Sequence, residues 1–386
     1  MSSKIFQLLV IVVLLVTNSF ALAAQQVITV ERSKVLAQVG SVIWKATPQE
    51  IPVRQGVGEL VEVEHDGATA MRLHFKVKTP TAMPIWMIEI LDRDERVIAA
   101  YTPAALETSF WTTEITGDRV QVRVISVQPN APEQVQLDGV AIVGVPVIPQ
   151  AIVGDDEREP IVHPNVPDEI KTLGKAVARL RFISDDGKQY VCSGFLVSSE
   201  LFMTNQHCPK SPAEVSSALI DFDYDTPNVT PKVTTFKKLE MSDIPLDFAI
   251  FRLSWTFPNR TPLQLEATIP QPDQLFWLIQ HPAGEPKQLS RTDCRAVGIS
   301  IPGVTPARTD FGHRCDTLGG SSGSMVLDRQ TKKVIGLHHL GFEKTDPCIV
   351  NITNQCLVNR AVLMDQIIPF IQKKRPDIAT EMGLTP

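Results

Sequence analysis

The sequence predicts an all-β protein built from two strand-rich units, with one short helix near the C-terminus. Apolar and polar residues alternate along four runs of the first unit, which cover residues 61–64, 71–77, 86–90 and 120–124. A period of two is typical of strands that bury one face. No helical period of similar length occurs in residues 25–148, so this unit is predicted to be a small antiparallel β-sandwich.

The second unit is predicted from shorter apolar runs at residues 176–182, 195–197 and 248–251. Such short, closely spaced runs favour a second all-β unit, which we assign to residues 169–375. One helix is predicted from about Asn359 to Ile368, because Pro369 cannot continue the hydrogen-bond ladder of a helix. Residues 376–386 are expected to form a tail.

Residues 149–168 are expected to connect the two units. Four prolines and the acidic cluster Asp155-Asp156-Glu157 fall in this stretch. Proline has no main-chain N–H and disfavours regular structure. The stretch therefore predicts a linker, or an extended segment that lies on the second unit.

The first residues predict export. Lys4 precedes an apolar run at residues 5–16, and the stretch Ala21-Leu22-Ala23-Ala24 follows. This order is typical of a secretory signal peptide, so residues 1–24 should be removed by cleavage near Ala23 or Ala24. The apolar run is shorter than the ~20 residues that span a bilayer, so stable membrane insertion is not expected. The mature protein is then secreted, either extracellular or periplasmic.

The composition excludes several classes of protein. With 43% hydrophobic and 21% charged residues, the chain can bury ordinary cores. A net charge of -6 argues against a nucleic acid partner, because phosphate binding requires a basic face. The sequence holds no signal for the oligomeric state.

The cysteines predict disulfides. An exported chain with an even number of cysteines favours bridges over free thiols. No Cys-x-x-Cys pair occurs, so no metal site is expected. The six positions are Cys192, Cys208, Cys294, Cys315, Cys348 and Cys356.

Three segments together indicate chemistry. His207 lies in Thr204-Asn205-Gln206-His207-Cys208, Asp247 precedes the apolar run 248–253, and Ser322 lies in Gly320-Ser321-Ser322-Gly323. In these motifs and in their order the sequence resembles the chymotrypsin-like serine peptidases, and among them the secreted glutamyl endopeptidases of bacteria. The resemblance covers residues 152 to 373. It implies a double β-barrel for the second unit and a His-Asp-Ser catalytic triad.

The resemblance also implies the role of each residue. His207 would accept the proton of the Ser322 hydroxyl, and Asp247 would orient the imidazole. The N–H groups of Gly320 and Ser322 would form the oxyanion hole. The expected activity is hydrolysis of proteins or peptides through an acyl-enzyme, without a cofactor.

The same resemblance implies the bridges Cys192–Cys208, Cys294–Cys315 and Cys348–Cys356, although six cysteines allow about 15 pairings. The sequence departs from the trypsin pattern at Ser321. Trypsin-type enzymes carry an aspartate there, which pairs with the new amino terminus after activation. Maturation of this chain must therefore work differently.

Specificity rests on two residues. Members of the glutamyl branch carry a histidine and a threonine that His338 and Thr317 match, and together these side chains could bind a glutamate carboxylate. A buried strand residue is the alternative role for His338. Asp316 indicates the competing preference for Lys or Arg. Residues 152–158 resemble the start of mature glutamyl endopeptidases.

Three alternatives stay open at this point. The protein could be an inactive adhesin with a peptidase fold, or a carbohydrate-binding or cell-surface-binding protein whose main activity lies in residues 25–148. Those residues could be either an accessory domain or a propeptide.

The series Asp221-x-Asp223-x-Asp225 lacks the glycine and the distal glutamate of a calcium loop, so it predicts a polar strand edge or turn.

Overall fold

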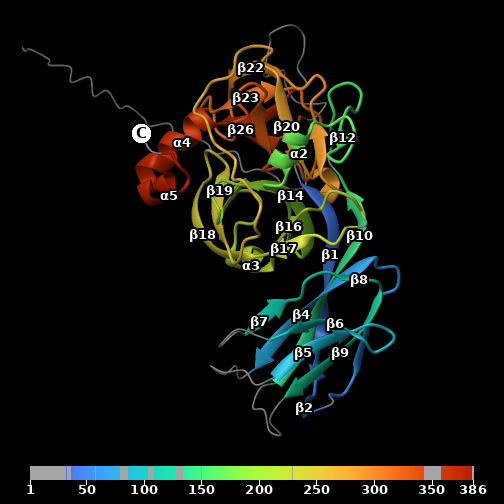
Figure 1. The fold of residues 1–386 in the computed structure, drawn as a ribbon. Helices are drawn as coiled ribbons and strands as arrows, with labels where there is room; N and C mark the ends of the chain where they lie inside the picture. The colour runs from blue at the N-terminus through green and yellow to red at the C-terminus, as the bar shows by residue number, and fades with distance from the viewer. Residues whose placement is uncertain are drawn as a thin grey trace, which may run out of the picture.

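The computed structural model describes residue 32 and residues 36–56, 58–78, 86–102, 108–126, 134–148, 150–227, 229–342 and 358–384 of the chain. The predicted signal peptide and the expected Cys348–Cys356 bridge lie outside the described residues. Within the described ranges, no helix is both long and apolar enough to cross a membrane. The fold is almost entirely β-structure, as the sequence predicts (Figure 1).

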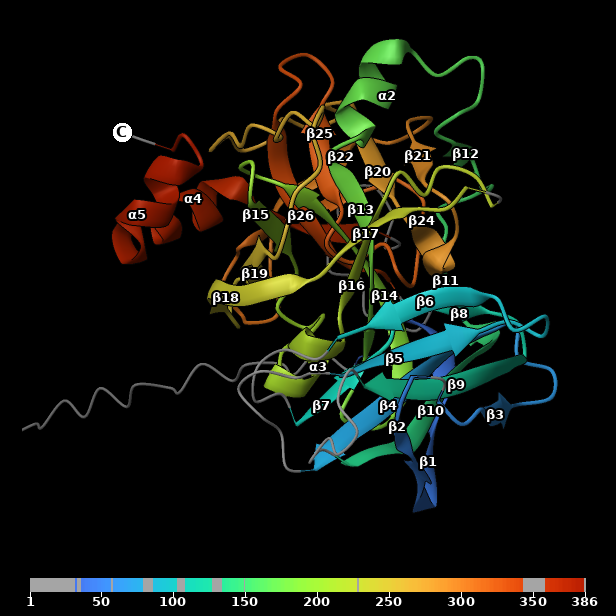
Figure 2. The same ribbon diagram turned by 60° about the horizontal axis from the view of Figure 1, so that its bottom comes forward.

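The first unit is a sandwich of two sheets (Figure 2). One sheet contains β1 (Ala37–Ile51), β10 (Gln134–Val147), β4 (Ala70–Lys78), β7 (Ser109–Trp111) and β8 (Ile115–Thr116). The other contains β2 (Val53–Gln55), β9 (Arg119–Ser126), β5 (Trp86–Leu91), β6 (Val97–Tyr101) and β3 (Val61–Glu64). All pairings are antiparallel except that of β2 with β9. Phe75, Ile88 and Val122 are fully buried in one core, which explains the period-two pattern of the strands.

β1 and β10 carry the sandwich into the second unit. β1 pairs with β10 and also with β14 (Lys188–Leu196), through pairs such as Ala37↔Val191. The two units therefore share one 12-stranded sheet (Figure 1). Leu36, just before β1, is buried in the core of the second unit. The first unit is thus built into the sheet and the core of the second.

The second unit contains two curled sheets. The first continues from β14 and holds β13 (Val177–Ile183), β15 (Leu201–Thr204), β16 (Leu219–Phe222), β17 (Lys232–Thr234), β18 (Phe236–Asp243) and β19 (Phe248–Leu253). The other has the order β12 (Glu159–Pro160), β21 (Gln288–Ser290), β20 (Phe276–Gln280), β25 (Met325–Asp328), β26 (Val334–Leu340), β27 (Asn359–Leu363), β23 (Asp310–His313) and β22 (Ala296–Ile301). Antiparallel pairing throughout produces the double barrel that was predicted.

The expected connecting segment lies on the second unit. β11 (Gln150–Ala151) pairs with β24 (Thr317–Leu318), and β12 pairs with β21. The short helix α2 (Asp168–Gly174) follows. Ile161 and Ile170 are buried in the core of the second unit, so apolar side chains hold the segment in place. The other short elements are the helix α3 (Pro212–Ser217) and the 3-10 turn η1 (Pro282–Gly284).

The C-terminal region differs from the prediction. Residues 359–363 form strand β27, and the helix α4 runs from Met364 to Lys374 with Pro369 inside it. β27 pairs with strands on both sides, which outweighs local helix propensity. Pro369 removes one helix hydrogen bond, but Ile367 and Ile371 are fully buried on the same helix and stabilise it. The expected tail contains a further helix, α5 (Pro376–Glu381), in which Ile378 is buried.

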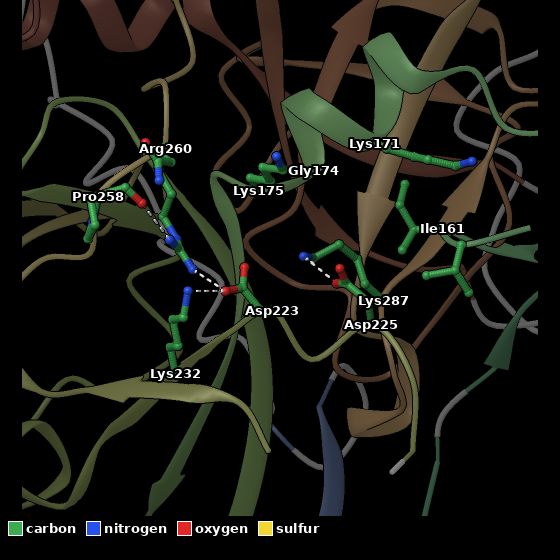
Figure 3. A pocket seen from close by; sticks show the side chains of 12 residues that line it. Ile161, Lys171, Gly174, Lys175, Asp223, Asp225, Lys232, Pro258, Arg260 and Lys287 are labelled. Atoms are coloured by element: carbon green, nitrogen blue, oxygen red, sulfur yellow. Dashed lines mark hydrogen bonds and ion pairs between the residues drawn. The ribbon is translucent and has the colours of Figure 1, made fainter. Parts of the chain in front are cut away.

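The three alternating aspartates form ion pairs with basic side chains. Asp221 is fully buried within β16, so it does not lie at a strand edge as expected. Asp223 and Asp225 line a pocket of about 420 Å³ together with their own cationic partners (Figure 3). The pairs are Arg179 and Arg181 with Asp221, Arg260 and Lys232 with Asp223, and Lys287 with Asp225.

Candidate active site

His207 and Asp247 lie side by side in the first barrel. His207 follows β15, and Asp247 stands in the turn between β18 and β19. Nδ1 of His207 is 2.7 Å from Oδ2 of Asp247, and the main-chain N–H of His207 donates to Oδ1 at 3.0 Å. Both side chains are buried. Because an ionised carboxylate only accepts hydrogen bonds, Nδ1 carries the proton and Nε2 of a neutral ring is left as an acceptor.

The turn that carries Asp247 adopts an uncommon backbone conformation. Its φ of 44° lies in the left-handed region, which non-glycine residues rarely adopt. The side chain of Asn205 donates to the carbonyl oxygen of Asp247 at 2.9 Å and so helps to hold the turn. Burial raises the pKa of Asp247, but the charge of His207 and hydrogen bonds from His207 and His339 outweigh burial and bring the pKa well below its usual range. Asp247 is therefore ionised at neutral pH.

Two disulfides brace this region. Cys192 is bonded to Cys208, next to His207, and Cys294 is bonded to Cys315, upstream of Ser322. Both pairs are those that the resemblance implies. The sulfurs of Cys192 and Cys208 and a ring nitrogen of His207 lie within 4.8 Å of one another. Because the two sulfurs are bonded to each other, they are not thiolate ligands for a metal.

Ser322 lies in a tight turn between β24 and β25. Gly320 and Gly323 have φ values of 97° and 88°, a region that favours glycine. A Cβ on Gly323 would lie 2.1 Å from the carbonyl oxygen of Ser193, so no larger residue fits there. Among the described residues, the N–H groups of Gly320 and Ser322 donate to no acceptor. Both donors are available to a developing oxyanion.

The hydroxyl of Ser322 is not hydrogen-bonded to His207. Its Oγ lies 3.4 Å from the carbonyl oxygen of His339, at the limit of a hydrogen bond. Nε2 of His207 is buried and has no hydrogen-bond partner in the described part of the chain. The structure thus joins His207 to Asp247, whereas the expected bond from Ser322 is not formed. In unliganded sites such bonds are often long or poorly aligned and tighten when substrate binds.

A second histidine contacts Asp247, and sequence reasoning missed it. Nδ1 of His339 is 3.0 Å from Oδ2 of Asp247, and Nε2 is 2.6 Å from Oδ2 of Asp310. All three side chains are buried. Burial lowers the pKa of His339, but the charge of Asp310 and hydrogen bonds with both carboxylates raise it to about 9. The signal in the sequence was the pair His338-His339. Because neighbouring residues of a strand point to opposite faces, the two rings must have different surroundings, and each needed its own assignment.

His338 and Thr317, the expected specificity residues, are both buried. Nδ1 of His338 is 3.1 Å from Nε2 of His313. Burial and the neighbouring histidines hold the pKa of His338 well below its usual range, and burial and His339 lower that of His313 to about 3. His338 is therefore neutral at pH 7. The hydroxyl of Thr317 has no partner among the described residues.

Asp316 binds another part of the chain. Its Oδ1 accepts a hydrogen bond from the N–H of Val153, and its Oδ2 accepts one from the N–H of Glu157, both at 2.9 Å. Each carboxylate oxygen is thus engaged by the main chain of residues 153–157. This arrangement disfavours the competing preference for a Lys or Arg side chain in the pocket.

The segment before Val153 lies between Thr317 of β24 and Gly341, which follows β26. Ala151 pairs with Thr317 on one side, and a Cβ on Gly341 would lie 2.7 Å from the Cβ of Ala151 on the other. The carbonyl oxygen of Ala151 accepts a hydrogen bond from the side chain of Asn359 at 2.9 Å. The chain itself therefore fills the space beside Thr317, whose side chain is buried.

Comparison with known proteins finds a similarity to one protein family over this region. Residues 192–337 match the family model described as the trypsin-like peptidase domain. This stretch is less than half of the chain, and over it the chain is similar to a trypsin-like peptidase domain. The matched stretch includes His207, Asp247 and Ser322 and ends one residue before His338.

Individual relatives are distant. The secreted RxLR effector protein 73 of Plasmopara viticola is 25% identical over 204 residues, which cover 48% of this chain and 50% of that protein. The chain thus spans about half the length of the curated relative it matches. The active form of the Rv3671c protease of M. tuberculosis is 16% identical, with a TM-score of 0.40 and coverage of 61% and 96%. The scabies mite inactivated protease paralogue S-I1 is 12% identical, with a TM-score of 0.43 and coverage of 53% and 96%.

Proposed function

We propose that the protein is a secreted serine endopeptidase that acts through His207, Asp247 and Ser322. The observation that carries this proposal is the 2.7 Å hydrogen bond between His207 and Asp247, together with Nε2 of His207, which has no partner in the part of the chain that the structure describes. This arrangement gives the ring the tautomer that can accept a serine proton. The intact residues also favour an enzyme over an inactive adhesin or a binding protein with the same fold.

The chemistry follows from these groups. Oγ of Ser322 attacks the carbonyl carbon of the scissile bond while Nε2 of His207 takes the hydroxyl proton. The N–H groups of Gly320 and Ser322 bind the oxyanion of the tetrahedral intermediate. His207 then gives its proton to the leaving amine, and an acyl ester remains on Ser322. A water molecule deprotonated by His207 cleaves this ester and restores the free serine.

Secretion is part of the proposal. The apolar run after Lys4 is typical of a signal peptide, and two disulfides suit an oxidising compartment. The distant relative in Plasmopara viticola also has a name that describes a secreted protein.

We further propose cleavage after glutamate. Thr317 carries a buried hydroxyl without a partner among the described residues, and His338 has a neutral ring, so both would contribute hydrogen bonds rather than charge to a substrate carboxylate. The engagement of Asp316 by Val153 and Glu157 removes the main argument for a basic substrate side chain.

Paired peptides that differ only in Glu or Gln before the scissile bond test this preference. The Glu peptide should be cleaved with the higher kcat/KM. Thr317→Val should reduce kcat/KM for the Glu peptide, relative to the Gln peptide, roughly 10-fold to 100-fold, since a hydrogen bond to a charged group contributes about 1.5–3 kcal/mol. The Gln peptide serves as the control for general loss of activity. Equal rates for both peptides, or cleavage mainly after Lys or Arg in a peptide library, would contradict the preference.

The first unit is proposed to be an accessory domain that stays with the peptidase domain. It shares a sheet with the first barrel through β1 and places Leu36 in its core. The side chain of Arg32 also donates to the carbonyl oxygen of His207 at 2.7 Å. Since Ala151 lies against Thr317, maturation would consist of a cut in the connecting segment that frees the pocket without release of the first unit.

Labelling with an organophosphate measures this step. Ser322 is only 2% exposed in the intact chain, so its labelling should be slow and should speed up at least about 10-fold after a cut between residues 148 and 153. The two fragments should still elute together in size-exclusion chromatography. Equal labelling rates before and after the cut would count against a blocked pocket, and separation of the fragments would count against a retained domain.

A further inference from the structure

We infer that His339 is a positioning residue whose imidazolium, clamped between Asp247 and Asp310, fixes the Asp247 carboxylate and moderates its pull on the proton of His207. This inference rests on the proposed function. It assigns a role to two buried residues, His339 and Asp310, that lie outside the predicted triad.

Hydrogen-bond donors engage both oxygens of the Asp247 carboxylate. Its Oδ2 is shared by Nδ1 of His207 at 2.7 Å and Nδ1 of His339 at 3.0 Å, and its Oδ1 accepts from the main chain of His207. Three donors on two oxygens leave the carboxylate no second orientation of similar energy. The direction of the His207 ring, and with it the position of Nε2, follows from that orientation.

The second support is the number of protons on His339. Both of its ring nitrogens face carboxylate oxygens, on Asp247 at 3.0 Å and on Asp310 at 2.6 Å. A neutral ring would point a lone pair at one of these oxygens, which is repulsive unless that carboxyl is protonated. The favourable state is an imidazolium that donates on both sides. The pKa of about 9 agrees with this state.

The third support is the environment of the clamp. Asp310 is fully buried in β23 and accepts a further hydrogen bond from the hydroxyl of Thr309 at 2.8 Å. Among the described residues, the other titratable groups near the two rings are His313 in β23 and His338 in β26, whose pKa values are lowered and which are neutral at pH 7. On the other side, Arg32 pairs with Glu214 beneath the main chain of His207. His339 is thus the cation that lies directly on the Asp247 carboxylate.

The charge of His339 affects the pH at which His207 becomes a free base. Asp247, Asp310 and a protonated His339 together carry one negative charge next to His207. Loss of the His339 proton donor leaves two negative charges there, and an added negative charge favours protonated His207. His207 would then need a higher pH to become the free base that catalysis requires, so the acid limb of the kcat/KM profile moves to higher pH.

His339→Gln tests the inference, because glutamine can donate to Asp247 but carries no charge. The acid limb should rise by about one pH unit or more. At pH 8 the value of kcat/KM should fall roughly 10-fold to 100-fold, because glutamine does not bridge Asp247 and Asp310 as the imidazolium does and so holds the Asp247 carboxylate, and with it His207, less firmly. Asp310→Asn is the matched variant, since it removes a negative charge and must leave the acid limb unchanged or lower it. If His339 had a merely structural role, both variants would lose activity, but the acid limb would not rise in His339→Gln while staying in place or falling in Asp310→Asn.

A second measurement covers the case in which His339→Gln does not fold. Histidine ¹⁵N NMR of the Ser322→Ala protein should show His339 doubly protonated at pH 7, with both N–H protons retained. A neutral His339 at that pH, or an acid limb that stays in place in folded His339→Gln, overturns the inference. If organophosphate fails to label Ser322 in wild-type protein that has been cut between residues 148 and 153, the proposed function fails instead, and the NMR measurement still tests the clamp.

Discussion

Ser322→Ala is expected to abolish peptide-bond hydrolysis and to leave the fold intact. The substitution removes the one atom that would form the acyl-enzyme, and loss of a triad serine in a comparable enzyme lowers kcat on the order of a millionfold. The Ser322 hydroxyl makes only a 3.4 Å contact with the carbonyl oxygen of His339, so little stability should be lost with it. Hydrolysis of a peptide library by purified protein measures the first effect, and thermal unfolding measures the second.

Ser324→Ala is the matched control for this experiment. Ser324 lies two residues away in the same turn and is fully buried, but its hydroxyl has no hydrogen-bond partner among the described residues. Its removal should change kcat/KM by less than a few fold. Proteolysis that persists at the wild-type rate in folded Ser322→Ala protein would rule out Ser322 as the nucleophile.

Asp221→Asn is expected to give the largest loss of stability. Asp221 is fully buried and binds two arginines, with its Oδ2 2.8 Å from Nε of Arg179 and 2.7 Å from Nε of Arg181. Neutralising it leaves two buried guanidinium groups without their shared anion, and breaking a buried ion pair in this way costs about 3–5 kcal/mol. Urea unfolding followed by circular dichroism measures the change in the free energy of unfolding.

Glu114→Gln provides the control, because it removes a partly exposed partner of the same Arg181. An exposed ion pair contributes about 0–1 kcal/mol, so this variant should stay close to the wild type. Burial raises the pKa of Asp221, but the two arginines outweigh burial and lower it to about 2. The stability that the ionised Asp221 contributes is therefore present above the unfolded pKa of about 3.9 and is lost as the pH falls toward 2. A destabilisation of Asp221→Asn no larger than that of Glu114→Gln would contradict the role of the buried cluster.

Local patterns predicted the strands because burial of one face leaves a direct mark on the sequence. β3, β4, β5 and β9 fall on the four alternating runs of the first unit. The patterns missed the extent of β1, whose long pairing with β10 and β14 depends on partners more than 80 residues away in the sequence. They also misplaced the last helix, since β27 is a strand only because β23 and β26 flank it.

By itself the sequence determined the fold class and the candidates His207, Asp247 and Ser322, and its resemblance to the chymotrypsin-like serine peptidases implied the cysteine pairs at 192–208 and 294–315. Each stands in a short motif, and a motif records a local chemical requirement such as glycine at a positive φ next to the nucleophile. The tertiary structure decided which groups share one carboxylate, which histidines carry a proton and which residues lie beside Thr317. His339 contacts Asp247 across 92 residues, and Ala151 pairs with Thr317 from outside the peptidase motifs. Such contacts depend on burial and on the charges of neighbours that only the folded chain brings together.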